Sequence, residues 1–593
     1  MDRLADENIL FSSISHQGDA RERRGLLHTI KEYYSHTEYQ PTREQIEKNR
    51  YVFFGLLRCR PWMAIPAGIL IQFCYGSVYA WSIFNGPINR LMTSDPNKGG
   101  AEVTFYIALG VLGITAAICG PWIETSHPRK SGIIGLVIFF SGHLTSALAI
   151  YTHMISLLYF GYGFIAGIGL GIGYVSTIDA VSKWWPSARG TAAGCAVMGF
   201  GGGSLAFSAI NKWLIEKTDL SMAFLVLGLV NFALMLIGVQ FINPPPPGHN
   251  PDGVPMIDES EQQQYTQHSN QNSAASDAEQ GIEKPVRSPR MLGTLVADQP
   301  TLHVSLGEAL RSRDYWLLYV AFLANIVFCL VIISNLPRII DGLFGKGRKE
   351  PREPPLPEYV AVSIEGGFNM VGRVMVGLLS DVLGRKTTFL MLLLTQILVL
   401  IFIPVAIRED SFWGFLSLVW VATVCYGGGF GMIPAFLADM FGSNNTSSCH
   451  GIILTAWSIA SVGGGLVFTG VVNHYLSHGS KPYESVMYTV NFMWMLALAI
   501  VGFVCCLFVR ASIRDRMFPA LPNQVIRIRI FGRVLRVLCM RNAPPSDDPN
   551  QPERCKRFAL VEYLTKAQEQ AAWEEYLALR SVQYRLMKEP NNY

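Results

Sequence analysis

Residues 359–386, YVAVSIEGGFNMVGRVMVGLLSDVLGRK, place an arginine, Arg373, in the middle of a stretch that is otherwise typical of a membrane-spanning helix. A charged side chain at that depth is costly in hydrocarbon, so it usually faces a water-filled cavity or an ion of opposite charge. At 1.5 Å per residue, Arg373 lies about 12 Å along the helix from Asp381. We therefore expect Arg373 to mark a binding site for an anion.

The rest of the chain repeats this kind of apolar stretch. Of its 593 residues, 50% are hydrophobic and only 16% are charged, whereas soluble proteins carry about 25% charged residues. Each stretch is long enough for the roughly 20 residues that cross a bilayer as a helix, so we expect an all-α integral membrane protein. Twelve spans are predicted, at 61–86, 102–122, 131–151, 155–180, 189–213, 221–242, 315–338, 358–380, 386–407, 411–437, 450–474 and 486–509.

The twelve spans divide into two sets of six around a polar stretch. Residues 244–300 are too polar to bury enough apolar surface to offset the entropy lost on ordering, so we expect them to be disordered. The predicted parts are a cytosolic tail at 1–60, an N-terminal six-helix half at 61–243, a cytosolic linker at 244–314, a C-terminal six-helix half at 315–509 and a basic cytosolic tail at 510–593.

A short loop pattern recurs in the two halves and indicates a duplication. After the second span the chain carries Glu124, and after the eighth it carries Asp381, each four residues beyond a glycine. We expect these loops either to brace a gate that closes one end of the bundle or to fix their own shape. The basic residues that complete the pattern are Arg129, Lys130, Arg385 and Lys386.

Basic residues also predict which end of the bundle faces the cytosol. Short loops at 127–130, 183–189 and 385–386 carry Lys and Arg with few acids, and they fall on the same side as both tails. The positive-inside rule assigns that side to the cytosol. The opposing loop at 345–358 also holds bases, but three glutamates accompany them. A glycosylation sequon at 444–446 falls on the cytosolic side, so we expect it to stay unmodified.

The C-terminal tail contains two segments of different character. Residues 525–538 alternate bases with aliphatic residues, which indicates either a segment lying on anionic lipid or an extended linker. Residues 557–587 have helical periodicity and mixed charge, and predict a short solvated helix.

No pattern in the chain indicates an enzyme, a metal site or a nucleic-acid partner. The eleven cysteines are scattered without CxxC pairs, and HExxH, GxSxG and Walker motifs do not occur. A glycine pattern at 161–166 imitates a dinucleotide-binding fingerprint, but it lies inside a predicted span with no strand before it. We therefore predict no cofactor, no metal ligand and no catalytic residue.

Five motifs lie in or beside predicted spans. They are GSVYAWSIF at 76–84, KWWPSARG at 183–190, SIEGGFNMVGR at 363–373, YGGGF at 426–430 and HGIILTAW at 450–457. Together they resemble the oxalate/formate antiporter family, a branch of the major facilitator superfamily close to the monocarboxylate transporters. The resemblance covers about residues 60–510. It implies two six-helix halves with a substrate site between them at the middle of the membrane.

The resemblance also implies roles for single residues. In this family the arginine of the eighth span, here Arg373, pairs with a substrate carboxylate, because its fork of donors matches two carboxylate oxygens. A structural link to the other half is the alternative role. Aromatic residues that line the cavity in this family match Tyr79, Tyr174, Phe200, Tyr426 and Phe430.

Two departures from the family pattern bear on substrate and coupling. Oxalate-transporting members carry a lysine in the eleventh span where this chain has Trp457. In the eighth span, Glu365, Asn369 and Arg373 follow one another at four-residue spacing, and we expect them to form one polar stripe facing the cavity. Glu365 is therefore a candidate for carrying a coupling proton, or else a hydrated residue of the cavity wall.

These patterns predict a secondary carrier for small monocarboxylates such as lactate, pyruvate or formate, coupled to protons. The alternatives are an exchanger of the oxalate/formate type and a membrane receptor or scaffold that does not transport. The expected partners are a small organic anion, protons and membrane lipid, with both termini in the cytosol of an unspecified cell membrane.

Overall fold

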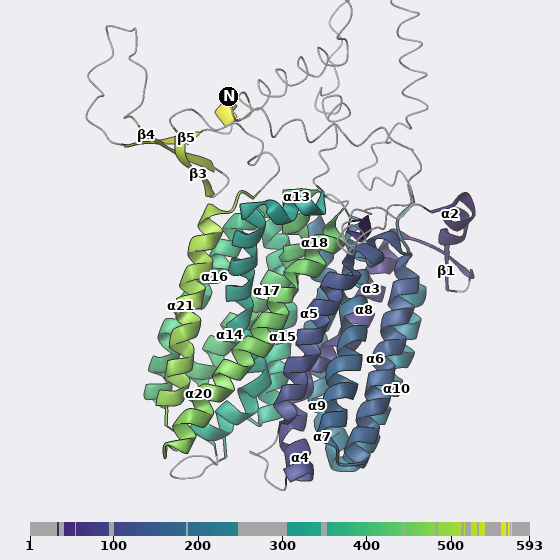
Figure 1. The fold of residues 1–593 in the computed structure, drawn as a ribbon, viewed down its shortest axis with the longest axis vertical. Coiled ribbons are helices and arrows are strands. Elements are labelled where there is room, and N and C mark those ends of the chain that lie inside the picture. The colour runs from purple at the N-terminus through teal and green to yellow at the C-terminus, as the bar shows by residue number, and fades with distance from the viewer. Residues whose placement is uncertain are drawn as a thin grey trace, which may run out of the picture.

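The chain folds into a bundle of long helices with a small β-sheet beyond one end (Figure 1). Within the described residues, twelve helices are long and apolar enough to cross a membrane, which confirms the predicted all-α architecture. The computed structural model describes residues 32–34, 41–53, 55–93, 100–185, 188–246, 305–345, 353–442, 445–480, 484–511, 515, 524–530, 533–539, 559–564, 567–569 and 571.

The first six spans follow a short helix and a two-stranded hairpin. The elements are α2 (Arg43–Asn49), β1 (Tyr51–Val52), β2 (Leu57–Arg58), η2 (Pro61–Met63), α3 (Ala64–Tyr75), η3 (Gly76–Trp81), α4 (Ser82–Thr93), α5 (Ala101–Thr125), α6 (Pro128–Tyr151), α7 (Ile155–Leu158), η4 (Tyr159–Ala166), α8 (Gly167–Ser182), α9 (Arg189–Lys217) and α10 (Leu220–Gln240).

The last six spans follow a short helix that lies across one end of the bundle. The elements are α13 (Leu306–Arg311), α14 (Arg313–Phe344), α15 (Glu358–Leu383), α16 (Arg385–Arg408), α17 (Phe412–Phe441), α18 (Thr446–Ile453), α19 (Thr455–Ser458), η5 (Ile459–Gly464), α20 (Gly465–Ser477) and α21 (Val486–Phe508).

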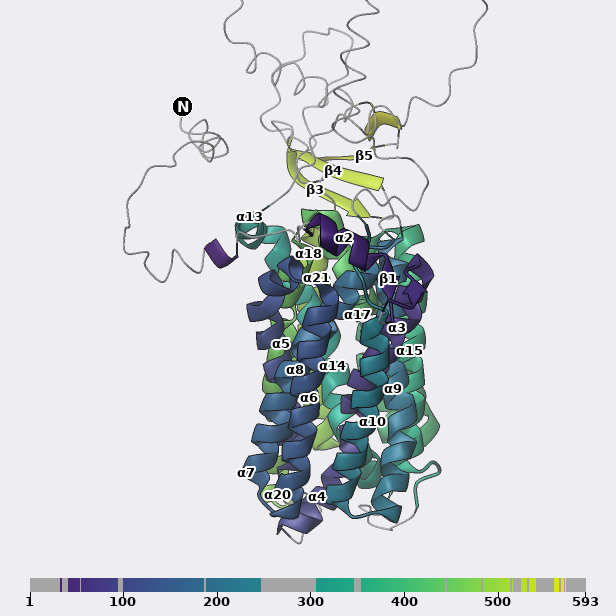
Figure 2. The same cartoon turned by 90° about the vertical axis from the view of Figure 1, so that its right-hand side faces the viewer.

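The two sets of helices lie side by side, the first in purple to blue and the second in teal to yellow-green (Figures 1 and 2). They meet along two seams, where α9 lies against α15 and where α5 lies against α18 and α19. Glycines permit this close approach: a Cβ on Gly120 of α5 would come 3.0 Å from the Cα of Ser448. Small residues at helix contacts are typical of membrane bundles.

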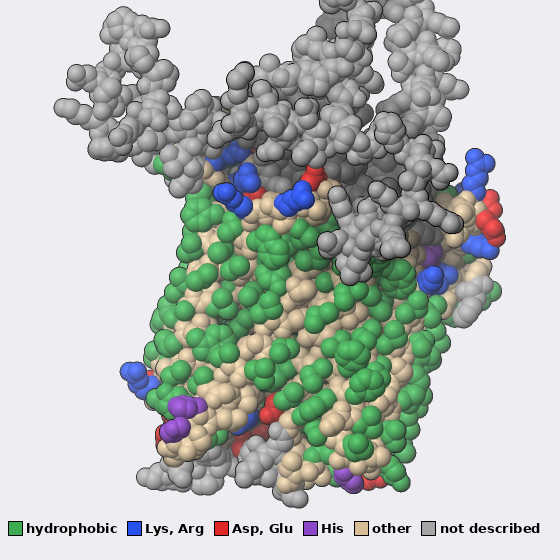
Figure 3. All heavy atoms as spheres, in the orientation of Figure 1, with side chains coloured by type: hydrophobic (Ala, Val, Ile, Leu, Met, Phe, Trp, Pro, Cys, Tyr) green, Lys and Arg blue, Asp and Glu red, His purple; other side chains and the backbone are tan. Residues whose placement is uncertain are grey.

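Hydrophobic side chains cover the flank of the bundle, whereas charged side chains gather at its two ends (Figure 3). Large aliphatic residues stand exposed on this flank, among them Ile118 at 56% and Val501 at 50%. Water would penalise such a surface, and the hydrocarbon of a bilayer would not. The protein is therefore an integral, multi-pass membrane protein.

Two spans depart from regular α-helix where they carry predicted site residues. Tyr79 lies in η3, a 3₁₀ segment of the first span, and Trp457 lies directly before η5, a π-helical segment of the eleventh. Such segments inside helices frequently mark functional positions. The local backbone at both residues is thus set apart from the regular spans around them.

In the described part of the tail, strand β3 (Gln524–Ile530) pairs antiparallel with β4 (Arg533–Cys539). This pairing corrects the prediction of an extended linker at 525–538, whereas contact of the segment with anionic lipid stays a prediction. Within β3, arginine alternates with isoleucine from Ile526 to Ile530, a period of two that places the two kinds of side chain on opposite faces of a strand.

The helix predicted at 557–587 is also corrected, because its beginning is a third strand. Strand β5 (Ala559–Leu564) pairs antiparallel with β4 in the order β3-β4-β5. Arg529 of β3 forms ion pairs with Asp515 and Glu569, at 2.7 and 2.5 Å. Pairing of β5 with β4, which lies 20 or more residues earlier in the chain, therefore outweighed the helical periodicity of this segment.

The predicted disordered linker falls mostly outside the described residues, which resume at residue 305. Its last part forms α13, whose start is fixed by a capping box between Ser305 and Glu308. The chain then turns at Ser312, whose side chain caps α14. The linker prediction thus ran several residues too far.

Candidate anion-binding site

Arg373 lies in the middle of α15 and is completely buried. The helix ends at Gly384, whose φ of 89° suits a residue without a side chain, so the guanidinium stands ten residues inside that end. Its Nε donates to Oδ1 of Asn369, one turn earlier, at 2.7 Å. Its Nη1 and Nη2 have no hydrogen-bonding partner in the structure.

Glycines from both halves hold α15 at this residue. A Cβ on Gly194 of α9 would overlap the carbonyl oxygen of Arg373, and a Cβ on Gly431 of α17 would come 2.5 Å from the same atom. Any larger residue at either position would push the helices apart. The backbone of Arg373 is therefore in close contact with both α9 and α17 at the place where the two halves meet.

Two phenylalanine rings flank the guanidinium of Arg373. Its Cζ lies 5.3 Å from the ring centre of Phe200 on α9 and 5.3 Å from that of Phe430 on α17. A cation over an aromatic face is stabilised by the ring quadrupole, although this attraction does not satisfy N–H donors. The cation is thus sandwiched between a ring from each half, while two of its nitrogens stay available to an acceptor.

The other predicted aromatic residues complete the same cluster. The hydroxyls of Tyr79 and Tyr426 are in hydrogen-bond contact across the two halves. Trp457 packs on Phe430 at 4.4 Å between ring centres and on Tyr174 at 5.5 Å. The six aromatic residues come from five separate spans, and the structure brings all of them together around Arg373.

Several further donors in this cluster are buried without a partner. They are the hydroxyl of Tyr174, Nε1 of Trp457 and Nδ2 of Asn369. A buried donor left without an acceptor is costly, so such groups normally meet a protein, water or ligand acceptor. An anion with two oxygens would supply acceptors to this donor-rich site.

Glu365 is buried as well, but it has different neighbours. It is 2% exposed, and its Oε1 accepts a hydrogen bond from Oγ1 of Thr423 at 3.3 Å. It forms no ion pair with any described residue. The predicted polar stripe is therefore divided: Asn369 contacts Arg373, whereas Glu365 contacts α17. The two predicted roles of Glu365, proton carrier and hydrated residue of the cavity wall, both stay predictions.

At the end of the bundle that carries α13 and the β-sheet, Glu124 links the two halves. Its Oε2 accepts from the backbone nitrogen of Ser447 on α18 at 2.8 Å, and its Oε1 lies 3.2 Å from Nζ of Lys183. Lys183 also pairs with Asp179 at 2.7 Å. Burial lowers the pKa of Lys183, but the two carboxylates more than offset this and raise it above its ordinary value, so the lysine stays charged.

Asp381 makes the equivalent link on the other seam. Its Oδ2 accepts from the backbone nitrogen of Thr191 on α9 at 2.8 Å. Arg385 pairs with Asp381 at 2.6 Å and with Asp439 at 2.9 Å. Both acids of the repeated loop pattern therefore join the two halves at one end.

The remaining bases of the repeated loops contact their own half. Arg129 donates to the carbonyl of Gln240 at 3.1 Å and to Oδ1 of Asn243 at 2.7 Å. Lys386 donates to the carbonyl of Leu507 at 2.6 Å, and Lys130 is exposed. For Arg129 and Lys386 the contacts favour the prediction of loop-shaping roles over that of a brace between halves.

Sequence reasoning missed several polar residues of these two regions. Thr191 and Ser447 hold the links between the halves, Lys183 pairs with Glu124 within the N-terminal half, and His450 is buried next to Tyr174. The available signal for His450 was its spacing of seven residues from Trp457, which places both on one face of a helix. The other three make contacts with residues 59, 190 and 323 positions away in the chain, and no local pattern indicates those.

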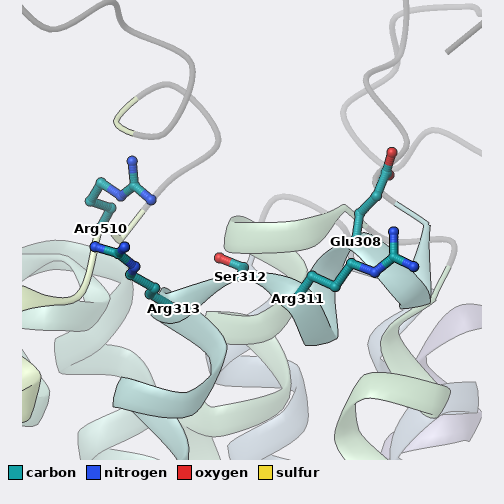
Figure 4. Close-up of a pocket in the computed structure, with 5 residues that line it drawn as sticks. All are labelled: Glu308, Arg311, Ser312, Arg313 and Arg510. Carbon is teal, nitrogen blue, oxygen red and sulfur yellow. The ribbon is translucent and has the colours of Figure 1, made fainter. Parts of the chain in front are cut away.

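A shallow groove of about 430 Å³ lies at the same end of the bundle, away from the buried cluster (Figure 4). Glu308, Arg311, Ser312, Arg313 and Arg510 line it. Arg510 pairs with Asp314 at 2.8 Å, which ties the start of the tail to α14. None of the predicted binding residues lies in this groove.

Two six-helix halves with a buried polar site at their interface define the class of the secondary membrane transporters. The family model of the Major Facilitator Superfamily matches residues 69–465, which is more than half of the chain. The protein therefore belongs to the Major Facilitator Superfamily.

Relatives of the predicted type are among the proteins that this chain resembles. The uncharacterized MFS-type transporter YhjX of Escherichia coli is 24% identical over 68% of this chain and 86% of its own length. The oxalate:formate antiporter of Oxalobacter formigenes is 22% identical over 70% and 85%. Human monocarboxylate transporter 14 is 21% identical over 74% and 89%. The predicted family resemblance is confirmed.

A solved structure of similar fold is that of the proton:xylose symporter XylE bound to 6-bromo-6-deoxy-D-glucose. It covers 77% of this chain and 97% of its own, with a TM-score of 0.52 and 15% sequence identity. At 15% identity, this similarity supports the fold of the chain, which has two halves of six helices each.

Proposed function

We propose that the protein is a secondary carrier for small monocarboxylates, of the size of lactate, pyruvate or formate. The observation that carries this proposal is the buried guanidinium of Arg373, whose Nη1 and Nη2 have no hydrogen-bonding partner among the described residues and whose Cζ lies over the rings of Phe200 and Phe430. A carboxylate that bridges Nη1 and Nη2 would neutralise the charge and satisfy both donors. The names of two relatives, an oxalate:formate antiporter and a monocarboxylate transporter, agree with such a cargo.

The surroundings of Arg373 favour an anion with one charge and a small apolar body. The rings of Tyr174 and Trp457 would enclose a methyl or short alkyl group, and their polar atoms would reach a hydroxyl or keto oxygen. A second carboxylate would bring a second negative charge to a site with one arginine. Exchange of oxalate for formate is the alternative, and it requires a second cation near the cargo.

Transport would proceed by alternating access of the cluster to the two ends of the bundle. The links of Glu124 to Ser447 and of Asp381 to Thr191 close the end that carries α13. Opening that end requires both links to break. Because Arg373, Phe200 and Phe430 come from both halves, cargo bound between them would be exposed to one end at a time.

Glu365 is the proposed carrier of a coupling proton. A carboxyl that is 2% exposed and has only a threonine hydroxyl as hydrogen-bond partner is more stable protonated than ionised. It lies about 12 Å along α15 from Arg373, so it can exchange a proton without touching the cargo. Symport follows if cargo binding at Arg373 and protonation of Glu365 stabilise the same conformation.

Uptake into proteoliposomes tests the proposal. The purified protein should take up labelled lactate, pyruvate or formate, and an inward proton gradient should increase that uptake. Arg373→Lys should fold and insert normally but lose about tenfold or more of the transport rate, because lysine keeps the charge and lacks the two parallel donors.

Melting temperature and elution volume of Arg373→Lys in detergent serve as the controls for folding. Normal uptake by a correctly folded Arg373→Lys protein would remove this residue from the binding site. A wild-type protein that transports none of the acids in a panel of mono- and dicarboxylates would contradict the proposed function itself.

A further inference from the structure

We propose that His450 is a second substrate-binding residue, which binds the carboxylate of the organic anion between Arg373 and the end of the bundle closed by Glu124. The inference rests on the proposed function and deepens it, since it adds a second binding position for the cargo on one side of Arg373. His450 opens the motif at 450–457, but the resemblance assigns it no role.

The first observation is that His450 is a buried polar residue whose outer nitrogen is unsatisfied. It lies on α18 and is 2% exposed, and its Nε2 has no hydrogen-bonding partner. A neutral or charged imidazole can donate from this atom. A histidine kept only for packing would normally have its ring nitrogens satisfied, because an unmade buried hydrogen bond is costly.

A matched residue in the same protein shows the ordinary case. His143 on α6 is also 2% exposed, but its Nδ1 bonds to the carbonyl oxygen of Phe139 at 3.0 Å, and its ring packs on Phe139 and Tyr162. It is far in sequence from every residue of the site and faces other helices of its own half. His450 differs from it in having an unsatisfied nitrogen beside the site.

The second observation is the position of His450 along the eleventh span. Ser447, whose backbone nitrogen binds Glu124, lies three residues before it, and Trp457 lies seven residues after it. At 1.5 Å per residue these separations are roughly 5 and 10 Å along the axis. His450 therefore lies between the closed end and the aromatic cluster.

The third observation is a continuous series of unsatisfied groups that leads from Arg373 to His450. The ring of Tyr174 packs on Phe200, at 5.7 Å, and on His450, at 6.1 Å. The hydroxyl of Tyr174 makes no hydrogen bond of normal geometry with any described residue, but it lies close enough to the guanidinium of Arg373 to interact with it. Arg373, Tyr174 and His450 would thus offer a carboxylate successive donors toward one end of the bundle.

On the opposite side of Arg373, α15 presents Asn369 and then Glu365, which pairs with Thr423. That side offers an anion the amide Nδ2 of Asn369 and, beyond it, a carboxyl group. The series of donors therefore extends farther toward His450 than toward Glu365. A residue that binds cargo on only one side of Arg373 should change KM only for cargo that enters from that side.

The test uses two substitutions that differ in which imidazole nitrogen they imitate. The amide nitrogen of glutamine reaches about as far as Nε2, whereas that of asparagine reaches only as far as Nδ1. His450→Gln therefore keeps a donor where the carboxylate would bind, and His450→Asn removes it. Both substitutions keep a polar amide, so their effects on folding should be similar.

KM for labelled lactate is measured separately from each face of the membrane, in full-length protein reconstituted with one orientation, as checked by protease cleavage of the C-terminal tail. His450→Asn should raise KM about tenfold for substrate offered from the face that carries Glu124, the expected loss of one hydrogen bond to a charged group. KM from the opposite face should stay unchanged. His450→Gln should stay close to wild type, and the control His143→Asn should change neither value.

Equal changes of KM on both faces would assign His450 a structural role, and unchanged KM in His450→Asn would exclude it from cargo binding. Either result overturns the inference while transport by the wild type leaves the proposed function standing. Wild-type protein that moves no carboxylate would instead contradict the proposed function. If His450→Asn fails to reach the membrane while His450→Gln is active with wild-type KM on both faces, His450→Ala provides a second variant without the donor for the same comparison.

Discussion

Arg373 and Glu365 lie two turns apart on α15, yet their surroundings give them opposite electrostatic situations. Arg373 is a buried cation between two aromatic rings, with two unsatisfied nitrogens. Glu365 is a buried carboxyl that contacts Thr423 and no cation. A buried charge without a counter-ion is costly. In the proposed function, Arg373 would avoid this cost by binding an anion, and Glu365 would avoid it by taking up a proton.

Glu365→Gln should uncouple uptake from a proton gradient. Glutamine resembles the protonated carboxyl in shape and keeps an acceptor for Thr423, so the fold should tolerate it. Exchange of labelled for unlabelled lactate across the membrane should continue, whereas accumulation driven by an inward proton gradient should fall to the level without a gradient. If Glu365→Gln still accumulates lactate to the wild-type level when an inward proton gradient is imposed, Glu365 is not the proton carrier.

Trp457→Lys should shift the substrate preference toward dicarboxylates. In the wild type, the second carboxylate of oxalate would stay unpaired near Arg373, at a cost of several kcal/mol, and about 1.4 kcal/mol corresponds to tenfold in affinity. We therefore expect monocarboxylates to be favoured roughly a hundredfold, and a lysine in place of Trp457 to reduce that ratio.

The measurement for Trp457→Lys is inhibition of lactate uptake by oxalate, compared between variant and wild type. Phe430→Leu is the matched control, because it opens space beside Trp457 without adding charge. Robust oxalate uptake by the wild type would mean that another cation supplies the second positive charge, and His450 would be the first residue to examine.

At the scale of the elements, the seam between α9 and α15 depends on glycine. Gly194 faces the carbonyl oxygen of Arg373 and the Cα of Gly377, so the two backbones touch where the central site begins. Movement of one half against the other must pass through this contact. The same residue thus sets the packing of the seam and the position of the buried cation.

Gly194→Ala should impair transport, because its Cβ would overlap the backbone of Arg373. Overpacking of this kind costs about 1–3 kcal/mol, and we expect a lower melting temperature and a reduced transport rate. Gly367→Ala on the facing helix α15 is the control, since its Cβ would lie 3.6 Å from Cδ1 of Leu205, an ordinary contact. Equal transport by the two variants would show that α9 and α15 are not held by this glycine.

The β-sheet of the tail shows how elements outside the membrane attach to the bundle. Arg529 bridges Asp515 and Glu569, and Arg510 pairs with Asp314 at the start of α14. These pairs tie segments of the tail to one another and to the C-terminal half. The alternation of charge and aliphatic residues in β3 therefore serves pairing within the sheet.

At the scale of the whole molecule, one end of the bundle is closed by links between the halves. Glu124 and Asp381 occupy equivalent places in the repeated loops, and each binds a backbone nitrogen of the opposite half. A duplicated sequence thus produces a duplicated closure, one on each seam. Opening of that end must break both, which couples the two seams in a single motion.

The sequon at 444–446 tests the orientation of the whole molecule. Asn445 is 4% exposed and lies beside Ser447, at the end that carries α13 and the β-sheet. We expect that end to face the cytosol, so no glycan should be attached in a eukaryotic host. The measurement is the electrophoretic mobility before and after treatment with a glycosidase.

A sequon introduced between residues 345 and 358, in the loop at the opposite end, is the control for glycosylation and should acquire a glycan. A glycan on Asn444 or Asn445, together with none on the introduced sequon, would contradict the predicted orientation.

The twelve spans, the two halves and the depth of Arg373 were determined by the sequence alone, because hydrocarbon demands about twenty apolar residues per span and penalises a buried charge locally. The family motifs also indicated which aromatic residues surround Arg373. Only the tertiary structure decided that Glu365 faces Thr423, that His450 lies beside Tyr174, and that Glu124 binds Ser447. These contacts join helices far apart in the chain, and the strand pairing of the tail does the same, so they depend on packing between elements that no local pattern encodes.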